Sequence, residues 1–268
     1  MEISRSPLFH EEWDVLPDKD TLDWYEKRSP DYAETCAALS AAVMARKFRA
    51  KAYIVHTSAG LSVEALRPLL KLPDMKRYVT VETCPHYLVC NTASEAGLLA
   101  KVNPPVRTEE DSRMLWEGIF DGTVNSIGTD HCNSTFEKKG GRSDQNRVKP
   151  GFGGVGLLLP LLISEGYHKR GLSLERIAAI TSTIPASVFG LKQKGRILEG
   201  CDADFAICDL EEEFTVEAGR LNSASDYSIY EGMRLKGRPV MTICRGNVVM
   251  EHNEITAEAG TGRYIRRV

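Results

Sequence analysis

The segment from Pro30 to Gly60, "PDYAETCAALSAAVMARKFRAKAYIVHTSAG", contains the pattern that decides the fold. Residues 30–51 are rich in alanine and place apolar residues at helical spacing, which predicts a helix. Residues 52–60 form a run of aromatic and β-branched residues that ends in small residues, as is typical of a buried strand followed by a turn. A helix that leads directly into a buried strand indicates an α/β protein.

The same alternation continues toward the C-terminus. Further strands are predicted at residues 78–88 and 124–132, and further helices at residues 62–72, 109–122, 157–171 and 173–191. Strands that alternate with helices predict parallel βαβ units. The polar stretch from Phe136 to Pro150 is typical of a mobile surface loop.

The pattern changes near residue 195, where short runs of β-type residues are separated by turns that contain glycine. These runs predict a small antiparallel sheet. We therefore expect two domains, one over residues 1–194 and one over residues 195–268.

Composition limits the kind of protein that this chain can be. Of its 268 residues 42% are hydrophobic and 26% are charged, and the net charge is −3. This balance gives no reason to expect nucleic-acid binding. The chain contains no run of 18 or more apolar residues, the length needed to cross a membrane. The first residues, "MEISRSPLFHEEWD", lack the basic start and the apolar centre that are typical of a signal peptide. A cytoplasmic location is expected, with the seven cysteines reduced.

Three residues that can bind metal follow the predicted strand segments. His10 follows "SPLF", His56 follows "AYIV", and Asp130 follows "VNSIGT". Ligand sites of parallel βα proteins lie at the carboxyl ends of the strands, and imidazole and carboxylate are usual ligands of a catalytic zinc. Each residue also has a structural interpretation, since a histidine at a strand end can be a hydrogen-bonded structural residue and Asp130 can cap a turn.

Several motifs together resemble the cyclic amidohydrolases of the hydantoinase and dihydropyrimidinase type, to which allantoinases and dihydroorotases are related. The motifs are, in order, "VHTSAG", "ETCPHYL", "NPPVR", "LWEGIFDGTVNSIGTDHC", "ADFAICD", "YEGMRLKGRPVMTICRGNVV" and "GTGRYIRR".

The resemblance implies a (β/α)8 barrel with two divalent metals, expected to be zinc, an accessory β-sandwich, and a homo-oligomer. It also implies a role for eight residues. These are the metal ligands His10, His56 and Asp130, the supporting residues Glu12 and His131, and the substrate-binding residues Asn103, Phe152 and Gly153. Phe152 stands where hydantoinases often have asparagine, which leaves the identity of the ring open.

The implied reaction is the opening of a cyclic amide or ureide by attack of metal-bound hydroxide. Asp130 would take the proton of the attacking group and deliver it to the leaving nitrogen. No side-chain nucleophile is needed, so we interpret Cys132 as part of the wall of the site and His86 as structural.

The family also has an H-x-H pair and a carboxylated lysine that bridges the metals, and neither can be found in this chain. We therefore expect residues 1–194 to form the C-terminal part of the barrel and residues 195–268 to form a segment of the sandwich. A metal site that lacks these ligands is expected to bind metal weakly.

Two alternatives to a hydantoinase or dihydropyrimidinase remain open. The ring could be that of allantoin or dihydroorotate. The chain could also be an inactive, truncated homologue that acts as an interaction protein, because relatives of this kind keep the fold and lose metal ligands.

Overall fold

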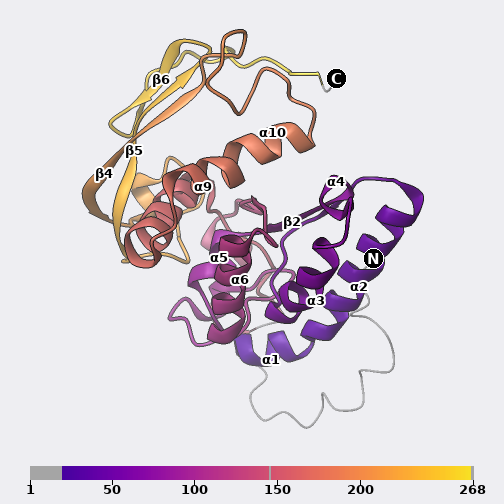
Figure 1. Cartoon of the computed structure of the whole chain (residues 1–268). Coiled ribbons are helices and arrows are strands. Elements are labelled where there is room, and N and C mark those ends of the chain that lie inside the picture. Colours follow the sequence, from indigo (N-terminus) through magenta and orange to yellow (C-terminus); the bar gives the residue numbers. More distant parts are fainter. Residues whose placement is uncertain (1–19, 145, 267–268) are drawn as a thin grey trace. The chain divides into compact units, whose positions relative to one another are not determined.

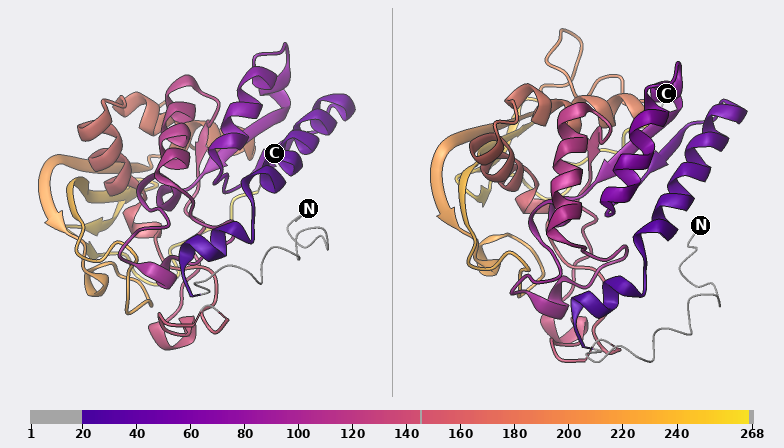
Figure 2. Two further views of the ribbon diagram at one scale, coloured as in Figure 1. Left: turned by 90° about the horizontal axis from the view of Figure 1, so that it is seen from below. Right: turned by 60° about the horizontal axis from the view of Figure 1, so that its bottom comes forward.

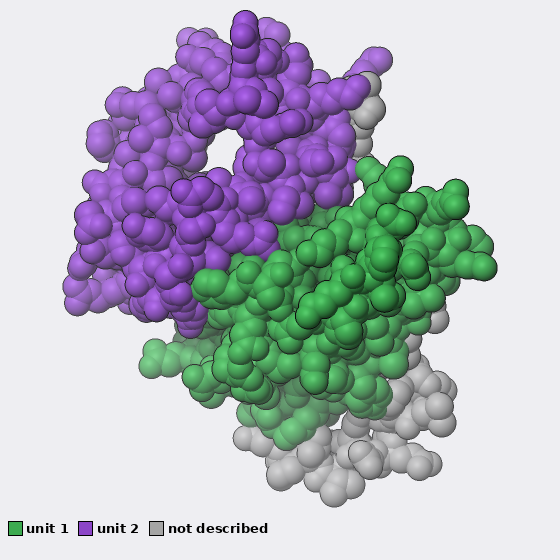
Figure 3. Space-filling view, in the orientation of Figure 1, with its two compact units in different colours: residues 1–155, 223–230 green, residues 156–222, 231–268 purple. Residues whose placement is uncertain are grey.

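The computed structural model describes residues 20–144 and 146–266, and the chain forms two compact units. The first unit comprises residues 1–155 and 223–230, and the second comprises residues 156–222 and 231–268 (Figure 3). Residues 223–230 join the first unit through hydrogen bonds. The side chain of Asp226 accepts the backbone N–H of Phe136 at 2.6 Å, and Asn133 Oδ1 accepts the hydroxyl of Ser223 at 3.1 Å.

The first unit contains a parallel sheet in the order β1-β2-β3. Its strands are β1 (Ala52–Ile54), β2 (Val79–Thr83) and β3 (Ser126–Ile127). Each strand pairs in parallel with its neighbour, so that Ile54 lies beside Val81 and Thr83 lies beside Ile127. The carboxyl ends of all three strands therefore meet at the same edge of the sheet.

Long helices connect and cover these strands. Helix α2 (Asp31–Phe48) packs against α3 (Gly60–Leu70), which packs in turn against α6 (Glu109–Asp121), as Figures 1 and 2 show. Four buried alanines of α2, at positions 33, 38, 42 and 45, present little side-chain bulk on its inner face.

The start of α6 is fixed by a capping box. Thr108 Oγ1 accepts the N–H of Asp111, and the carboxylate of Asp111 accepts the N–H of Thr108. This reciprocal pair satisfies two backbone donors that a helix start leaves free. The helix ends at Gly122, whose φ of 81° suits glycine.

The shorter elements of the first unit refine the sequence-based expectations. Strand β2 ends at Thr83 because Pro85 begins a helix, α5 (Pro85–Val89), where we expected the strand to continue. Strand β3 has only two residues. The stretch expected to be a mobile loop contains a helical turn, α7 (Phe136–Lys139), which ends in a buried lysine. The remaining short helices are α1 (Leu22–Lys27), α4 (Met75–Tyr78) and η4 (Gly97–Ala100).

The helices of the second unit follow one another along the chain. They are α8 (Leu158–Leu161), η6 (Leu162–His168), α9 (Leu174–Ala178), η7 (Ala179–Thr183) and α10 (Ile184–Val188), with η5 (Val155–Leu157) before them and η8 (Ala218–Arg220) further along the chain. The segments η6 and η7 are π-helical. The two helices expected at residues 157–171 and 173–191 are thus present with π-helical interruptions.

The sheet of the second unit is antiparallel, in the order β4-β5-β6-β7. Its strands are β4 (Phe205–Thr215), β5 (Arg234–Cys244), β6 (Asn247–Glu251) and β7 (Glu254–Ile255). Gly237 of β5 has a φ of 92° and lies against the side chain of Ile163, so a larger residue there would overlap η6.

The expected α/β class, with a parallel sheet followed by an antiparallel one, is confirmed. The boundary expected between residues 194 and 195 falls inside the second unit, where it separates helices from the sheet, and as a domain boundary it stays a prediction. Over residues 20–144 and 146–266, no helix is both long enough and apolar enough to cross a bilayer.

Candidate functional site

The candidate site lies at the carboxyl edge of the parallel sheet. His56 comes two residues after the last residue of β1, and Asp130 comes three residues after the last residue of β3. The structure brings these two predicted ligands into electrostatic range of each other. Burial raises the pKa of Asp130, and the charge of His56 opposes that rise.

His56 has a conformation that its surroundings must hold in place. Its φ is 40°, in the left-handed region that costs a residue other than glycine about 1–2 kcal/mol. Its backbone N–H donates to Oε1 of Glu82 at 3.1 Å. Its Nδ1 is buried and has no hydrogen-bond partner among the described residues, which leaves this nitrogen available to a ligand.

Glu82 connects the ends of the three strands. Besides the N–H of His56, its carboxylate accepts the hydroxyl of Tyr53 at 2.8 Å, and that hydroxyl is 2.7 Å from Ser126 Oγ. Gly128 lies so close to the carboxylate that an added Cβ would overlap it. A side chain at position 128 would therefore have to displace either Glu82 or the end of the strand.

Sequence reasoning missed Glu82, although a signal was present. The residues around it in β2 are buried, and an acidic residue in such a run is rarely without a partner. Its partners could not be identified without the register between the strands.

The loop before α3 is fixed by a second carboxylate, Glu34 of α2. Its Oε1 accepts the N–H groups of both Ser58 and Ala59, each at 3.0 Å. The side chain of Arg107, which is 1% exposed, lies 3.3 Å from Glu34 and 2.8 Å from Glu26. This network holds the chain that directly follows His56.

Asp130 and the three residues after it are exposed to solvent. Asp130 is exposed as a whole residue, its carboxyl is partly buried, and its φ is 47°. Nδ1 of His131 accepts the backbone N–H groups of Gly154 at 3.0 Å and of Val155 at 3.2 Å. His131 thus holds the loop that contains Gly153.

The predicted substrate-binding residues come from two segments. Asn103 is exposed, precedes a cis peptide bond to Pro104, and accepts a hydrogen bond from the hydroxyl of Tyr25. Phe152 is only 2% exposed, and its ring contacts His86 edge-on at 5.0 Å between centroids. Its carbonyl oxygen accepts the N–H of Cys132 at 2.9 Å. Phe152 thus shapes the loop as a packed side chain.

His86 is buried completely at the start of α5. Burial, and secondly the charge of His56, lower its pKa to about 3. Neither ring nitrogen has a hydrogen-bond partner among the described residues. The side chain is therefore a neutral imidazole in the packed interior of the unit.

The donor set of this edge fits a divalent metal only in part. His56 offers a buried, unpartnered nitrogen and Asp130 a carboxylate, which are suitable ligand types. Over the residues that the structure describes, no group of three or more His, Cys, Asp or Glu side chains is placed to hold a metal ion. The predicted ligand His10 and its neighbour Glu12 lie outside the described residues.

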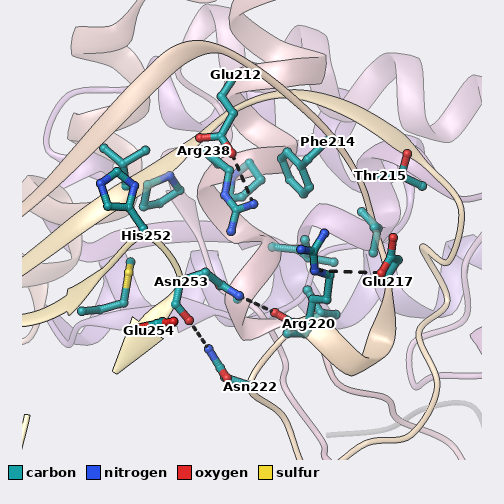
Figure 4. Close-up of a pocket in the computed structure, with 18 of the residues that line it drawn as sticks. Glu212, Phe214, Thr215, Glu217, Arg220, Asn222, Arg238, His252, Asn253 and Glu254 are labelled. Carbon is teal, nitrogen blue, oxygen red and sulfur yellow. Dashed lines mark hydrogen bonds and ion pairs between the residues drawn. The ribbon is translucent and has the colours of Figure 1, made fainter. Parts of the chain in front are cut away.

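A separate cavity of about 740 Å³ lies in the second unit, between α8 and strands β4, β5 and β6 (Figure 4). Arg238 projects into it, 3.6 Å from Glu212 and 4.7 Å from the centre of the Phe214 ring. Of the predicted site residues that the structure describes, none lines this cavity.

Comparisons with known proteins agree with these observations. The model of the amidohydrolase family matches residues 32–249. A D-phenylhydantoinase of Escherichia coli O1:K1 / APEC is 36% identical over 221 residues, which are 80% of this chain and 47% of that protein. An L-hydantoinase of Paenarthrobacter aurescens is 33% identical over 247 residues, covering 91% of this chain and 53% of that protein.

Solved structures give the same result. The L-hydantoinase (dihydropyrimidinase) from Arthrobacter aurescens matches with a TM-score of 0.89 at 32% identity, over 97% of this chain and 58% of that chain. The dihydropyrimidinase from Brevibacillus agri has a TM-score of 0.84 at 29% identity, over 92% of this chain and 55% of that chain. The chain spans about half the length of the curated relatives that it matches. The resemblance found in the sequence is confirmed, and this chain belongs to the amidohydrolase family.

Proposed function

We propose that this chain carries part of the active site of a metal-dependent hydrolase that opens a cyclic amide or ureide. The observation that carries the proposal is the placement of His56 after β1 and Asp130 after β3, at the same edge of the parallel sheet, with an unpartnered Nδ1 on His56. Both similar curated proteins named above are hydantoinases, which favours a hydantoin or dihydropyrimidine ring over allantoin or dihydroorotate.

His56 and Asp130 would hold the metal, with His10 as a further ligand. When bound, divalent metal, which we propose to be zinc, supplies Lewis-acid polarisation of the ring carbonyl and lowers the pKa of water. Glu82 keeps the backbone of His56 in its left-handed conformation, and His131 holds the loop of Gly153.

Asp130 would carry the proton of the reaction. The pKa of its carboxyl is raised by partial burial, so a proton on Asp130 is held more firmly than on an aspartate whose carboxyl is fully solvated. Asp130 would take a proton from the attacking water and deliver it to the ring nitrogen as the C–N bond breaks. Asn103 and the main chain of residues 152–153 would hold the ring.

We further infer that the parallel sheet and its helices are the C-terminal part of a (β/α)8 barrel, and that the antiparallel sheet is part of the accessory sandwich. The close match to solved hydantoinases supports this inference. We also propose that the protein is cytoplasmic and forms a homo-oligomer.

The test is ring opening by the purified chain with hydantoin, dihydrouracil, allantoin and dihydroorotate, with and without excess Zn²⁺. Because the described residues provide only two ligands, we expect hydrolysis to require metal in excess. Asp130→Asn should abolish it. The control is Asp74→Asn, at an exposed aspartate with a φ of 68°, which should keep full activity. A folded, metal-loaded wild-type chain that opens none of the four rings would exclude the proposed activity.

A further inference from the structure

Lys139, the last residue of α7, is a buried lysine that the proposed reaction does not use. Its residue exposure is 1%. Over residues 20–144 and 146–266, no carboxylate forms an ion pair with it. Its Nζ instead donates to two main-chain oxygens, that of Lys101 at 3.0 Å and that of Gly151 at 2.7 Å. A buried amine is costly unless hydrogen bonds satisfy it, so these two contacts define its role.

The two carbonyl groups belong to the two segments that contain the candidate substrate-binding residues. Lys101 lies two positions before Asn103, and Gly151 directly precedes Phe152 and Gly153. The N–H of Gly151 donates to the same Lys101 oxygen at 2.9 Å. Lys139 Nζ therefore lies at the junction of both segments.

Further contacts tie Lys139 to the second of these segments. Its Nζ lies 5.5 Å from the centre of the Phe152 ring, and its own carbonyl oxygen accepts the N–H of Lys149 at 2.8 Å. Phe152 is in turn bonded through its carbonyl oxygen to the N–H of Cys132, two residues after Asp130. The lysine is thus connected through the backbone to the chain that contains the proposed proton carrier.

A space-filling role alone does not explain a lysine at this position. A methionine would fill a similar volume without the energetic cost of burying an amine. It would leave the carbonyl oxygen of Gly151 without the donor that Lys139 now provides. The amine is needed where two carbonyl groups from separate segments converge on one point.

We propose that Lys139 is a positioning residue for the substrate, which sets the spacing between segments 101–103 and 151–153 by hydrogen bonds to both. This inference rests on the proposed function, because it assumes that these segments hold the ring. Lys139 itself does not touch the substrate, since its side chain is enclosed.

The electrostatic surroundings are consistent with such a role. Burial, and secondly the charge of Lys101, lower the pKa of Lys139 to about 7, while Cys132 acts in the opposite direction. The amine keeps at least two N–H donors in either protonation state, so both hydrogen bonds persist on each side of this pKa.

The test compares Lys139→Met and Lys139→Gln with the control Lys138→Met, at the exposed neighbour on the same helical turn. In steady-state hydrolysis we expect Lys139→Met to raise KM at least tenfold while kcat changes less than threefold. Lys139→Gln retains an N–H donor and should recover part of the lost KM. Lys138→Met should match the wild type in both constants.

Hydrogen exchange of the full chain gives a second readout that needs no activity. In Lys139→Met the amides of Gly151 and Cys132 should exchange at least tenfold faster, while those of α6 keep their protection. Unchanged exchange and unchanged KM in a folded Lys139→Met variant would overturn the proposal. If Lys139→Met does not fold, the same criteria apply to Lys139→Gln, in which both readouts should still move.

The two proposals can fail separately. A wild-type chain without hydrolase activity refutes the proposed function, whereas the exchange rates still decide whether Lys139 fixes the two segments. An active chain in which the lysine variants raise only the unfolding rate, with KM unchanged, refutes the positioning role alone.

Discussion

The backbone N–H of His56 donates a hydrogen bond of 3.1 Å to Oε1 of Glu82, which links the end of β1 to the end of β2. The same carboxylate accepts the hydroxyl of Tyr53. A candidate metal ligand in a left-handed conformation is thus held by a carboxylate from the neighbouring strand. This arrangement fixes the main chain of His56 and leaves its Nδ1 available.

The first prediction concerns Glu82→Gln. The amide of glutamine has one acceptor oxygen instead of two, so it can accept from His56 or from Tyr53 but not from both in the present geometry. We expect the free energy of unfolding to fall by about 1–3 kcal/mol in urea titrations. Glu64→Gln, at an exposed position of α3, should change it by less than about 0.5 kcal/mol. Equal effects of the two substitutions would contradict a special role for Glu82.

The second prediction concerns Gly128→Ala. The added methyl group would overlap the carboxylate of Glu82, so either the strand end or Glu82 must move. We expect a loss of roughly 1–3 kcal/mol in the free energy of unfolding, as for other overpacked sites. The matched control is Gly219→Ala, where nothing lies within 4 Å of the new carbon. Removing the clash with Glu82→Ala in the double variant should restore part of the loss, and strictly additive effects would refute the steric explanation.

The third prediction concerns Glu34→Ala. This change leaves the N–H groups of Ser58 and Ala59 without their acceptor and removes one of the two carboxylates near the buried Arg107. We expect a loss of roughly 1–3 kcal/mol, because two backbone donors lose their acceptor while Arg107 keeps its ion pair with Glu26. Thermal and urea unfolding measure this loss. Glu109→Ala, in the exposed first turn of α6, serves as the control and should cost far less.

The fourth prediction concerns the pH dependence of stability. The pKa of Lys139 is about 7 in the folded chain and near 10.5 when exposed. Between these values the unfolded chain binds more protons, so this group makes stability rise with pH over that window. Urea unfolding at pH 7.0 to 8.5 should show a steeper rise for the wild type than for Lys139→Met. Parallel lines for the two proteins would be inconsistent with a depressed lysine pKa.

The urea measurements stop short of pH 9 because the buried thiols make stability fall, and not rise, as the pH increases. Burial raises the pKa of Cys84 well above its usual range and that of Cys90 to about 12. The unfolded chain releases these protons first, so their contribution to stability is lost as the pH rises past 9. Comparing two variants at the same pH removes this shared term.

The sequence by itself determined the order and type of the main elements. The alanine-rich spacing of residues 31–48 and the apolar run that begins at Ala52 are local patterns, and each produced the element that it predicts. The same local reading placed His56 and Asp130 at strand ends. It overestimated the strands after Tyr78 and Val124, because a proline starts a helix at residue 85 and β3 pairs over only two residues.

Tertiary structure alone decided which residues support the candidate site. The role of Glu82 depends on its contacts with Tyr53, His56 and Gly128. The role of Lys139 depends on its hydrogen bonds to the carbonyl oxygens of Lys101 and Gly151. These partners lie far apart in the sequence, in part within a stretch whose polar composition predicted a mobile loop. The physical reason is that periodicity records which side of an element is buried, whereas hydrogen-bond partners depend on the register and packing between elements, which no local pattern records.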